Sequence, residues 1–228
     1  MTSAQLGLIA LVPAAYIAGS IPFGLIVGLS KGIDPRKAGS GNIGATNVGR
    51  LLGGKFFAIV FVLDLLKGLL PTLAAGAILH FKSASAAENA LWLTAGFAAI
   101  FGHMFSIFIG FKGGKGVATS TGVILGVFPY YTLGAVAALA VWGIVFMLTR
   151  YVSLASMAGA VAFTITYVIL GLVIPTWDIF GKQWPLLGFA ILVTVMIIVK
   201  HRGNLARLRA GTENRIGKKG SGANEVNQ

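Results

Sequence analysis

Glycine, serine, asparagine and threonine crowd together in residues 38–50, which read AGSGNIGATNVGR. Glycines leave backbone N–H groups accessible, and hydroxyl, amide and guanidinium groups add donors, so such a segment can wrap around an oxyanion. The spacing of its glycines also fits a dinucleotide fingerprint, but that motif needs a preceding strand, and here an uncharged apolar stretch comes before it. The alternative is a flexible turn between two membrane spans. The candidate ligands for an anionic substrate are Ser40, Asn42, Thr46, Asn47 and Arg50.

A second glycine-rich segment, GFKGGKGVAT, covers residues 110–119. It fails the P-loop pattern, because its spacing is one residue short and Gly116 stands where a Ser or Thr would meet magnesium. Its glycines still allow a ligand to approach the backbone, and the start of the following helix adds free N–H groups. The alternative is a basic turn that only fixes the orientation in a membrane. The predicted phosphate contacts are Gly113, Gly114, Lys115 and Gly116, with Lys112 as a further cationic candidate.

The third polar segment, KHRGNLARLRAGTE, covers residues 200–213. His201 and Asn204 are three residues apart and therefore share one face of a helix. The alternative is a juxtamembrane basic segment that is attracted to anionic lipid. Histidine and asparagine add nothing to such attraction, so we include both among the candidate substrate-binding residues.

Taken together, the three segments are rich in hydrogen-bond donors and cations and poor in acceptors, which predicts a site for a phosphate-bearing ligand. Apolar helices around it would also admit an acyl chain, so a transferase of lipid metabolism is the favoured class. The sequence contains no cysteine and no set of metal ligands, and we expect no cofactor. The alternatives are a transporter for a phosphorylated metabolite and a lipid-binding membrane protein without catalysis.

The elements that must position these segments are membrane helices. Of the 228 residues, 56% are hydrophobic and only 11% are charged, and the mean hydropathy is +0.86. Such a composition excludes a water-soluble enzyme and a disordered chain. We expect an all-α polytopic integral membrane protein with one domain over residues 1–216 and a polar, disordered tail over residues 217–228. The seven predicted transmembrane helices are Gln5–Leu29, Phe56–Leu79, Ala90–Ile109, Val117–Tyr131, Thr132–Thr149, Val152–Ile174 and Trp184–Val199.

Basic residues predict the orientation of these spans. With the N-terminus outside, nearly all Lys and Arg residues fall in cytoplasmic loops or in the C-terminal tail, and the outside loops keep only Lys82 and Lys182. The sequence therefore predicts a multi-pass protein of the cell (inner) membrane, with a cytoplasmic C-terminus and the site on the cytoplasmic side. Membrane lipids are its expected surroundings, and nothing indicates nucleic acid or an obligatory protein partner.

Three ionisable residues fall within the predicted spans. Asp64 and Lys67 are three residues apart in the second span, so we predict an ion pair between them. His103 lies in the third span, shortly before the second glycine-rich segment. We interpret it as a site residue, with a buried polar contact between helices as the alternative.

Several blocks of the sequence resemble the bacterial acyl-phosphate:glycerol-3-phosphate acyltransferase family. The blocks are SIPFG at residues 20–24, GSGNIGATNV at 39–48, GH at 102–103 with FKGGKGVAT at 111–119, and HRGN at 201–204 with GTE at 211–213. The resemblance implies seven spans with an outside N-terminus, in agreement with the charge pattern. It implies transfer of a fatty acyl group from acyl-phosphate to the 1-hydroxyl of glycerol 3-phosphate, giving lysophosphatidic acid and phosphate. It implies no metal and no acyl-CoA.

The resemblance also implies roles for single residues. Ser40 and Arg50 are expected to be essential, the segment around Lys115 to bind glycerol phosphate, His201 and Asn204 to contact substrate, and Glu213 to be structural. The proton acceptor stays open between His103, His201 and a phosphate oxygen of the substrate. The catalytic candidates are thus Ser40, Arg50, His103, Lys112 and His201.

Overall fold

The protein is described by a computed structural model that covers residues 2–81 and 85–216. The tail predicted for residues 217–228 lies outside the described residues. Within them the regular structure is helical. Its elements are α1 (Ser3–Ser20), α2 (Phe23–Leu29), α3 (Ala45–Leu52), α4 (Gly54–Ile78), α5 (Ala86–Met104), η1 (Ile107–Ile109), α6 (Val117–Gly126), α7 (Thr132–Thr149), α8 (Val152–Val173), η2 (Pro175–Trp177), α9 (Trp184–Lys200) and α10 (Arg202–Arg209).

The first predicted span is broken into α1 and α2. Pro22 has no backbone N–H, and a residue that precedes proline is driven away from the helical conformation. Ile21 accordingly adopts a ψ of 117° at the end of α1. The two helices together still give 27 residues of apolar chain, which is enough to cross a membrane.

The structure does not reproduce all seven predicted spans as long helices. Within the described chain, five segments are long and apolar enough to cross a membrane, and a sixth qualifies if α9 and α10, bent by 53°, form one span. The fourth predicted span, Val117–Tyr131, is helical only as α6, a helix of 10 residues. Such a helix is about 15 Å long, roughly half the thickness of the hydrocarbon core. The helix ends early because Pro129 cannot continue it.

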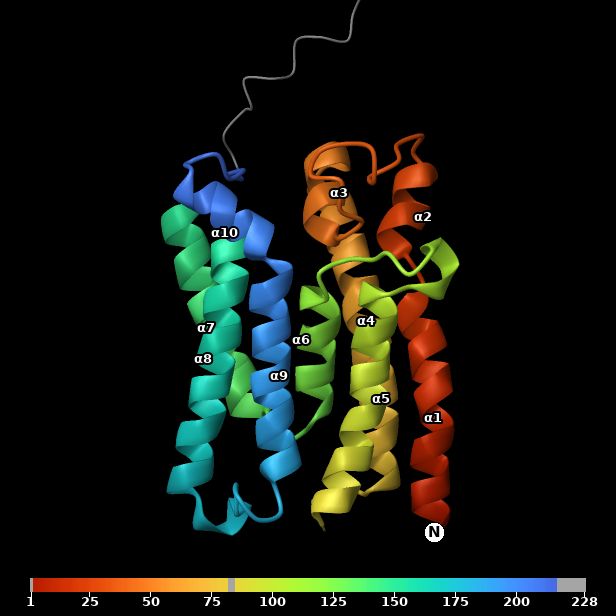
Figure 1. Ribbon diagram of the computed structural model, residues 1–228, viewed down its shortest axis with the longest axis vertical. Coiled ribbons are helices and arrows are strands. Elements are labelled where there is room, and N and C mark those ends of the chain that lie inside the picture. The colour runs from red at the N-terminus through yellow and green to blue at the C-terminus, as the bar shows by residue number, and fades with distance from the viewer. Residues whose placement is uncertain (1, 82–84, 217–228) are drawn as a thin grey trace, which may run out of the picture.

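The helices form two groups that meet along the middle of the molecule (Figure 1). In the first group α4 packs against α1, α5 and α6, and in the second α8 packs against α7 and α9. Contacts of α5 with α9 and of α6 with α7 join the groups. Small residues, Gly122 and Gly126 among them, allow the close approach of α4 and α6. A Cβ atom on Gly126 would lie 2.7 Å from the Cβ atom of Thr72.

Large aromatic side chains such as Trp92, Tyr131 and Phe163 are buried in the core, while many other large apolar side chains face outward. Trp92 is fully buried, and its indole Nε1 donates to the carbonyl of Thr72 at 2.8 Å. Leu148 and Val173, in contrast, are 79% and 70% exposed. An apolar exterior of this kind suits lipid as the surrounding solvent.

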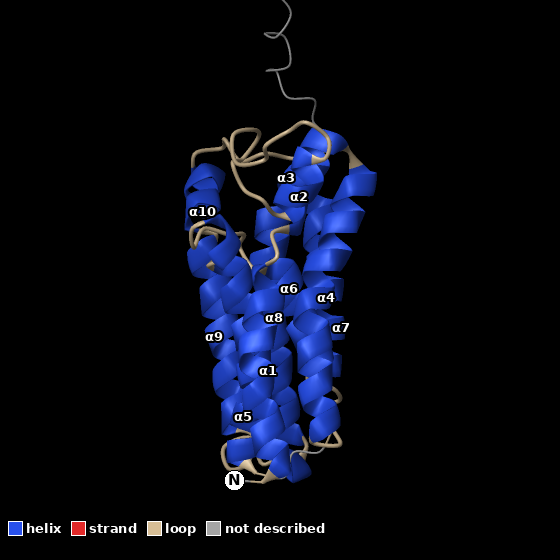
Figure 2. Cartoon of the chain, turned by 90° about the vertical axis from the view of Figure 1, so that its right-hand side faces the viewer, coloured by secondary structure: helices blue, strands red, loops and turns tan. Residues whose placement is uncertain are grey.

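The three polar segments of the sequence meet at one end of the bundle. Figure 2 shows α3 and α10 at the end opposite to the N-terminus, where long loops cross between the helices. The loop between α5 and α6 reaches the same region (Figure 1). The fold thus gathers residues that are as many as 164 positions apart in the chain.

Candidate functional site

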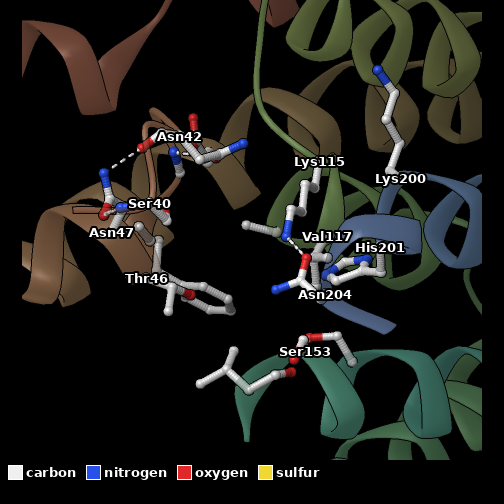
Figure 3. A pocket seen from close by; sticks show the side chains of 18 of the residues that line it. Ser40, Asn42, Thr46, Asn47, Lys115, Val117, Ser153, Lys200, His201 and Asn204 are labelled. Atoms are coloured by element: carbon white, nitrogen blue, oxygen red, sulfur yellow. Dashed lines mark hydrogen bonds between the residues drawn. The ribbon is translucent and has the colours of Figure 1, made fainter. Parts of the chain in front are cut away.

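A cavity of about 480 Å³ opens between the two helix groups at the end that carries the polar segments. All three segments contribute to its wall, and Figure 3 shows side chains of each around it. The predicted site residues that line it are Ser40, Asn42, Thr46, Asn47, Arg50, His103, Lys115, Gly116, His201 and Asn204.

Asn47 holds the first loop in shape. Its Oδ1 accepts a hydrogen bond from the backbone N–H of Ser40 at 2.8 Å. Its Nδ2 lies within hydrogen-bond distance of the carbonyl oxygens of Pro35, Ala38 and Asn42, at 3.0, 3.1 and 2.9 Å. The predicted substrate ligand Asn47 therefore uses its amide to organise the loop that presents Ser40 to the cavity.

Arg50 lies in the last turn of α3 and points its guanidinium group into the space between the helix groups. Its Nη2 donates to the carbonyl of Asn214 at 3.5 Å. Burial lowers the pKa of Arg50, and Glu213 partly opposes this effect. An arginine remains charged under such conditions, so it presents a fork of donors to an anion.

Fewer residues of the second glycine-rich segment line the cavity than the sequence predicts. Gly113 and Gly114 do not belong to the cavity wall; they pack on His103. The backbone N–H of Gly114 donates to the carbonyl of His103 at 3.1 Å, and a Cβ atom on Gly114 would collide with the imidazole. Lys112 is exposed and also lies outside the wall. Gly116 and Lys115 do line the cavity, so only these two residues of the loop lie where a substrate contact was expected.

Lys115 crosses the cavity to the third segment. Its Nζ donates to Oδ1 of Asn204, a bond that is visible in Figure 3. Burial lowers the pKa of Lys115 to about 8, with Glu213 opposing the shift and the cations Arg207 and Arg50 adding to it.

Glu213 binds the third segment to α8. It accepts hydrogen bonds from the hydroxyl of Ser153 at 2.9 Å, from Nδ2 of Asn204 at 2.6 Å and from Nε of Arg207 at 2.8 Å. Although burial by itself raises the pKa of Glu213, these bonds lower it, so the carboxylate is charged. Glu213 orients Asn204 and Arg207 toward the cavity, consistent with the structural role that the resemblance implies.

His201 is held as a neutral imidazole, and only one of its two nitrogens has a hydrogen-bond partner among the described residues. Its Nδ1 lies 2.8 Å from the carbonyl oxygen of Ile197, which can only accept, so Nδ1 carries the proton. Burial and the neighbouring Lys115 lower the pKa of His201 to about 4. Nε2 therefore has a free lone pair at the cavity.

The predicted ion pair in the membrane is confirmed, and it has a third member. Nζ of Lys67 lies 2.8 Å from Oδ1 of Asp64 and donates to the carbonyl of Ile21 at 3.0 Å. Nδ1 of His103 faces the same Asp64 oxygen at 3.7 Å. Asp64 and His103 both line the cavity.

Sequence reasoning missed the part of the wall that comes from α6, α7 and α8. Thr121, Trp142, Ser153 and Ser156 line the cavity, although none of them lies in a polar segment. The spacing of Ser153 and Ser156, three residues apart in an apolar span, was the available signal. Lys200 and Arg207 add two further cations to the wall.

A metal site would require several carboxylate or imidazole groups around one point. Over residues 2–81 and 85–216, no three His, Asp or Glu side chains gather in this way.

Comparison with known proteins gives the family of this chain. Residues 9–211 match the family model described as "Glycerol-3-phosphate acyltransferase". The glycerol-3-phosphate acyltransferase of Geobacter sulfurreducens is 46% identical over 208 residues, 90% of this chain and 96% of that relative. The chain belongs to the glycerol-3-phosphate acyltransferase family. The enzyme of the same name from Aquifex aeolicus is 42% identical over 207 residues, 90% of this acyltransferase and 97% of that relative.

Solved structures agree with this assignment. The acyltransferase is similar to the crystal structure of PlsY, an integral membrane glycerol 3-phosphate acyltransferase, in its glycerol 3-phosphate form. The TM-score is 0.80 at 40% identity, covering 92% of this chain and 96% of that one. The lysophosphatidic acid form of PlsY gives a TM-score of 0.78 at 39% identity, with 92% and 95% covered. The acyltransferase is thus an integral membrane enzyme of all-helical fold, and the resemblance found in the sequence motifs is confirmed at the level of the family.

Proposed function

We propose that this acyltransferase moves a fatty acyl group from acyl-phosphate to the 1-hydroxyl of glycerol 3-phosphate and releases lysophosphatidic acid and phosphate. The observation that carries the proposal is one cavity that is lined both by cations and hydrogen-bond donors and by apolar side chains. Both substrates are anions that carry a phosphate group, and the donor also carries a long apolar chain.

The polar wall supplies the contacts that two phosphate groups need. Arg50 reaches the cavity from α3, Lys115 from the loop before α6, and Arg207 from α10. A guanidinium fork binds phosphate oxygens in pairs, and a lysine adds a point charge. The backbone N–H groups at the start of α6, next to Gly116, add the positive end of a helix.

The apolar wall suits the acyl chain. Phe57 and Phe61 of α4 and Leu139 and Trp142 of α7 line the cavity from opposite helix groups. Leu139 is also 52% exposed, and Val136 and Met147 of the same helix are 59% and 66% exposed, so this part of the cavity wall belongs to a helix with an apolar outer face that suits lipid. An acyl donor dissolved in the membrane can therefore present its phosphate to the cations while its chain stays in an apolar environment.

The chemistry requires positioning rather than a covalent intermediate. Phosphate is a good leaving group, so the glycerol hydroxyl can attack the acyl carbon directly once both substrates are aligned and their charges are neutralised. Alignment of two reactants can lower a barrier by roughly 7–11 kcal/mol. The cations stabilise the charge that develops on the departing phosphate. No metal is required in this scheme.

We also infer the placement in the cell. The proposed topology has seven crossings, the short α6 included, with the N-terminus outside and the cavity on the cytoplasmic side of the cell membrane. The basic residues of the three segments support this orientation through the positive-inside rule.

Purified protein in detergent tests the proposal. Glycerol 3-phosphate and palmitoyl phosphate should give lysophosphatidic acid and inorganic phosphate, palmitoyl-CoA should give none, and EDTA should not reduce the rate. Product from palmitoyl-CoA alone, or a rate that EDTA abolishes and magnesium restores, would contradict the proposed donor or the proposed absence of a metal.

A further inference from the structure

The chain that follows α10 turns back toward the cavity instead of leaving the bundle. Gly211, with a φ of 70°, reverses its direction. The N–H of Gly211 donates to the carbonyl of Leu208 at 3.2 Å, and the N–H of Thr212 donates to the carbonyl of Arg207 at 2.9 Å. This is the Schellman arrangement, which glycine favours at the end of a helix. We name residues 212–216, which come next, the C-terminal strap.

The strap is held at both of its ends. At its start, Glu213 accepts three hydrogen bonds from side chains of α8 and α10. At its end, the N–H of Ile216 donates to the carbonyl of Arg150 at 3.0 Å. The guanidinium group of Arg215 lies over the ring of Tyr151, 4.9 Å from its centroid, and a cation in that place is attracted to the ring. Arg150 and Tyr151 form the turn between α7 and α8, so the strap is tied to the second helix group.

Asn214 lies between these two attachments and reaches the other helix group. Its carbonyl oxygen accepts from Nη2 of Arg50 on α3 at 3.5 Å, a long hydrogen bond. Arginine has a flexible side chain, and holding such a side chain still is part of the cost of binding a ligand. A carbonyl that holds one nitrogen of Arg50 reduces this cost, and the other N–H groups of the guanidinium remain available to a phosphate.

We propose that the C-terminal strap orients Arg50 for the phosphate of glycerol 3-phosphate, and that Tyr151 and Arg215 are positioning residues that keep the strap in place. Both residues lie outside the cavity wall, so they act on the substrate only through Arg50. The inference rests on the proposed acyl transfer. An orienting contact of this kind favours binding in the ground state and in the transition state alike, so its loss should raise KM and leave kcat unchanged.

Substitution on either side of the contact between Arg215 and Tyr151 tests the inference in the full-length protein. Tyr151→Ala and Arg215→Ala should each raise the KM for glycerol 3-phosphate by about 3- to 5-fold, the scale of one cation–π contact. The kcat of both variants should stay within about twofold of the parent. Either variant is sufficient for the test if the other does not fold.

Conservative variants show whether the contact itself is responsible. Tyr151→Phe keeps the aromatic ring and Arg215→Lys keeps the cation, so both should have a KM close to that of the parent. If Tyr151→Phe raised KM as much as Tyr151→Ala, the ring would not be the cause, and the inference would be overturned.

Combination with Arg50→Lys separates positioning of Arg50 from a general effect on the fold. In that background Tyr151→Ala should change KM by less than about twofold, because the guanidinium that the strap orients is absent. A further 3- to 5-fold rise, as large as about the effect in the parent background, would show that the strap acts independently of Arg50 and would contradict the inference.

The matched control is Lys31→Ala, which removes a cation–π contact elsewhere. Nζ of Lys31 lies 5.6 Å from the centroid of the Phe56 ring, and both residues are outside the cavity wall. This variant should keep the KM and kcat of the parent. A parent-like KM in Tyr151→Ala and Arg215→Ala, even with a lower melting temperature, would mean that the strap only stabilises the fold and would overturn the inference. If the parent itself makes no lysophosphatidic acid from acyl-phosphate, the proposed function fails instead.

Discussion

Lys115 and Asn204 stand 89 residues apart in the chain and share a hydrogen bond across the cavity. The bond joins the loop before α6, in one helix group, to α10, in the other. Because Asn204 also donates to Glu213 at 2.6 Å, and Glu213 binds Ser153 on α8, the two groups are connected by one polar network at the site. The geometry of the cations depends on this network.

Replacement of Arg50 by lysine should lower kcat/KM for glycerol 3-phosphate by roughly 10- to 100-fold, although the charge is kept. A guanidinium fork binds phosphate in a bidentate manner that an ammonium group cannot reproduce. Steady-state kinetics with a parallel melting curve measures the effect. Arg209→Lys, at an exposed position on α10 outside the cavity wall, is the control and should behave like the parent. Similar kinetics for both variants would remove Arg50 from the site.

The pH dependence of the reaction should show the low pKa of Lys115. Burial lowers this pKa to about 8, so the ammonium charge is present below pH 8 and is lost as the pH rises through that value. Binding of an anion should weaken with it, and kcat/KM for glycerol 3-phosphate should fall above pH 8. Lys115→Arg keeps its charge and should remove this basic limb. A basic limb that persists unchanged in the arginine variant would assign it to another group.

Glu213→Gln should reduce both stability and substrate binding. The substitution removes the charge that receives Ser153, Asn204 and Arg207, and it leaves buried donors poorly paired. We expect a loss of about 1–3 kcal/mol in the free energy of unfolding and a higher KM for glycerol 3-phosphate. Thermal unfolding and a titration on the same preparation measure both. Glu88→Gln, at the other end of the bundle where Glu88 binds Ser85, is the control for KM.

Gly114→Ala should act through His103. A Cβ atom at this position would collide with the imidazole and displace it, and displacement by about 1 Å can cost roughly 100-fold in turnover. We therefore expect a lower kcat with little change in KM. Gly143→Ala, on α7 with no atom near the added methyl group, should have no effect. A raised KM with normal kcat would instead support the direct phosphate contact that the sequence suggests.

Much of the site was predictable because its residues carry their chemistry in local patterns. Glycine, asparagine and arginine in the first loop, and histidine and asparagine at helical spacing in the third, predict a site without any knowledge of the fold, and the structure brings both segments to one cavity. The i, i+3 spacing of Asp64 and Lys67 was enough to predict their ion pair, since a helix places such residues on one face.

Other features depended on contacts between distant segments. The local sequence does not show that the side-chain amide of Asn47 hydrogen-bonds to its own loop. Nor does it show that Gly114 packs against the imidazole of His103 instead of contacting a phosphate group. Hydropathy likewise cannot show that α6 ends after 10 residues. Residues 127–131 are as apolar as the helix itself, but Pro129 among them prevents the helix from continuing.

The sequence by itself determined the environment and the kind of ligand, since the hydropathy of a segment and the charge of a side chain are properties of the residues alone. The tertiary structure decided which donors face one another across the cavity. That choice depends on how helices from both halves of the chain pack, and it brings Asp64 to His103 and Lys115 to Asn204, pairs that no spacing in the sequence reveals.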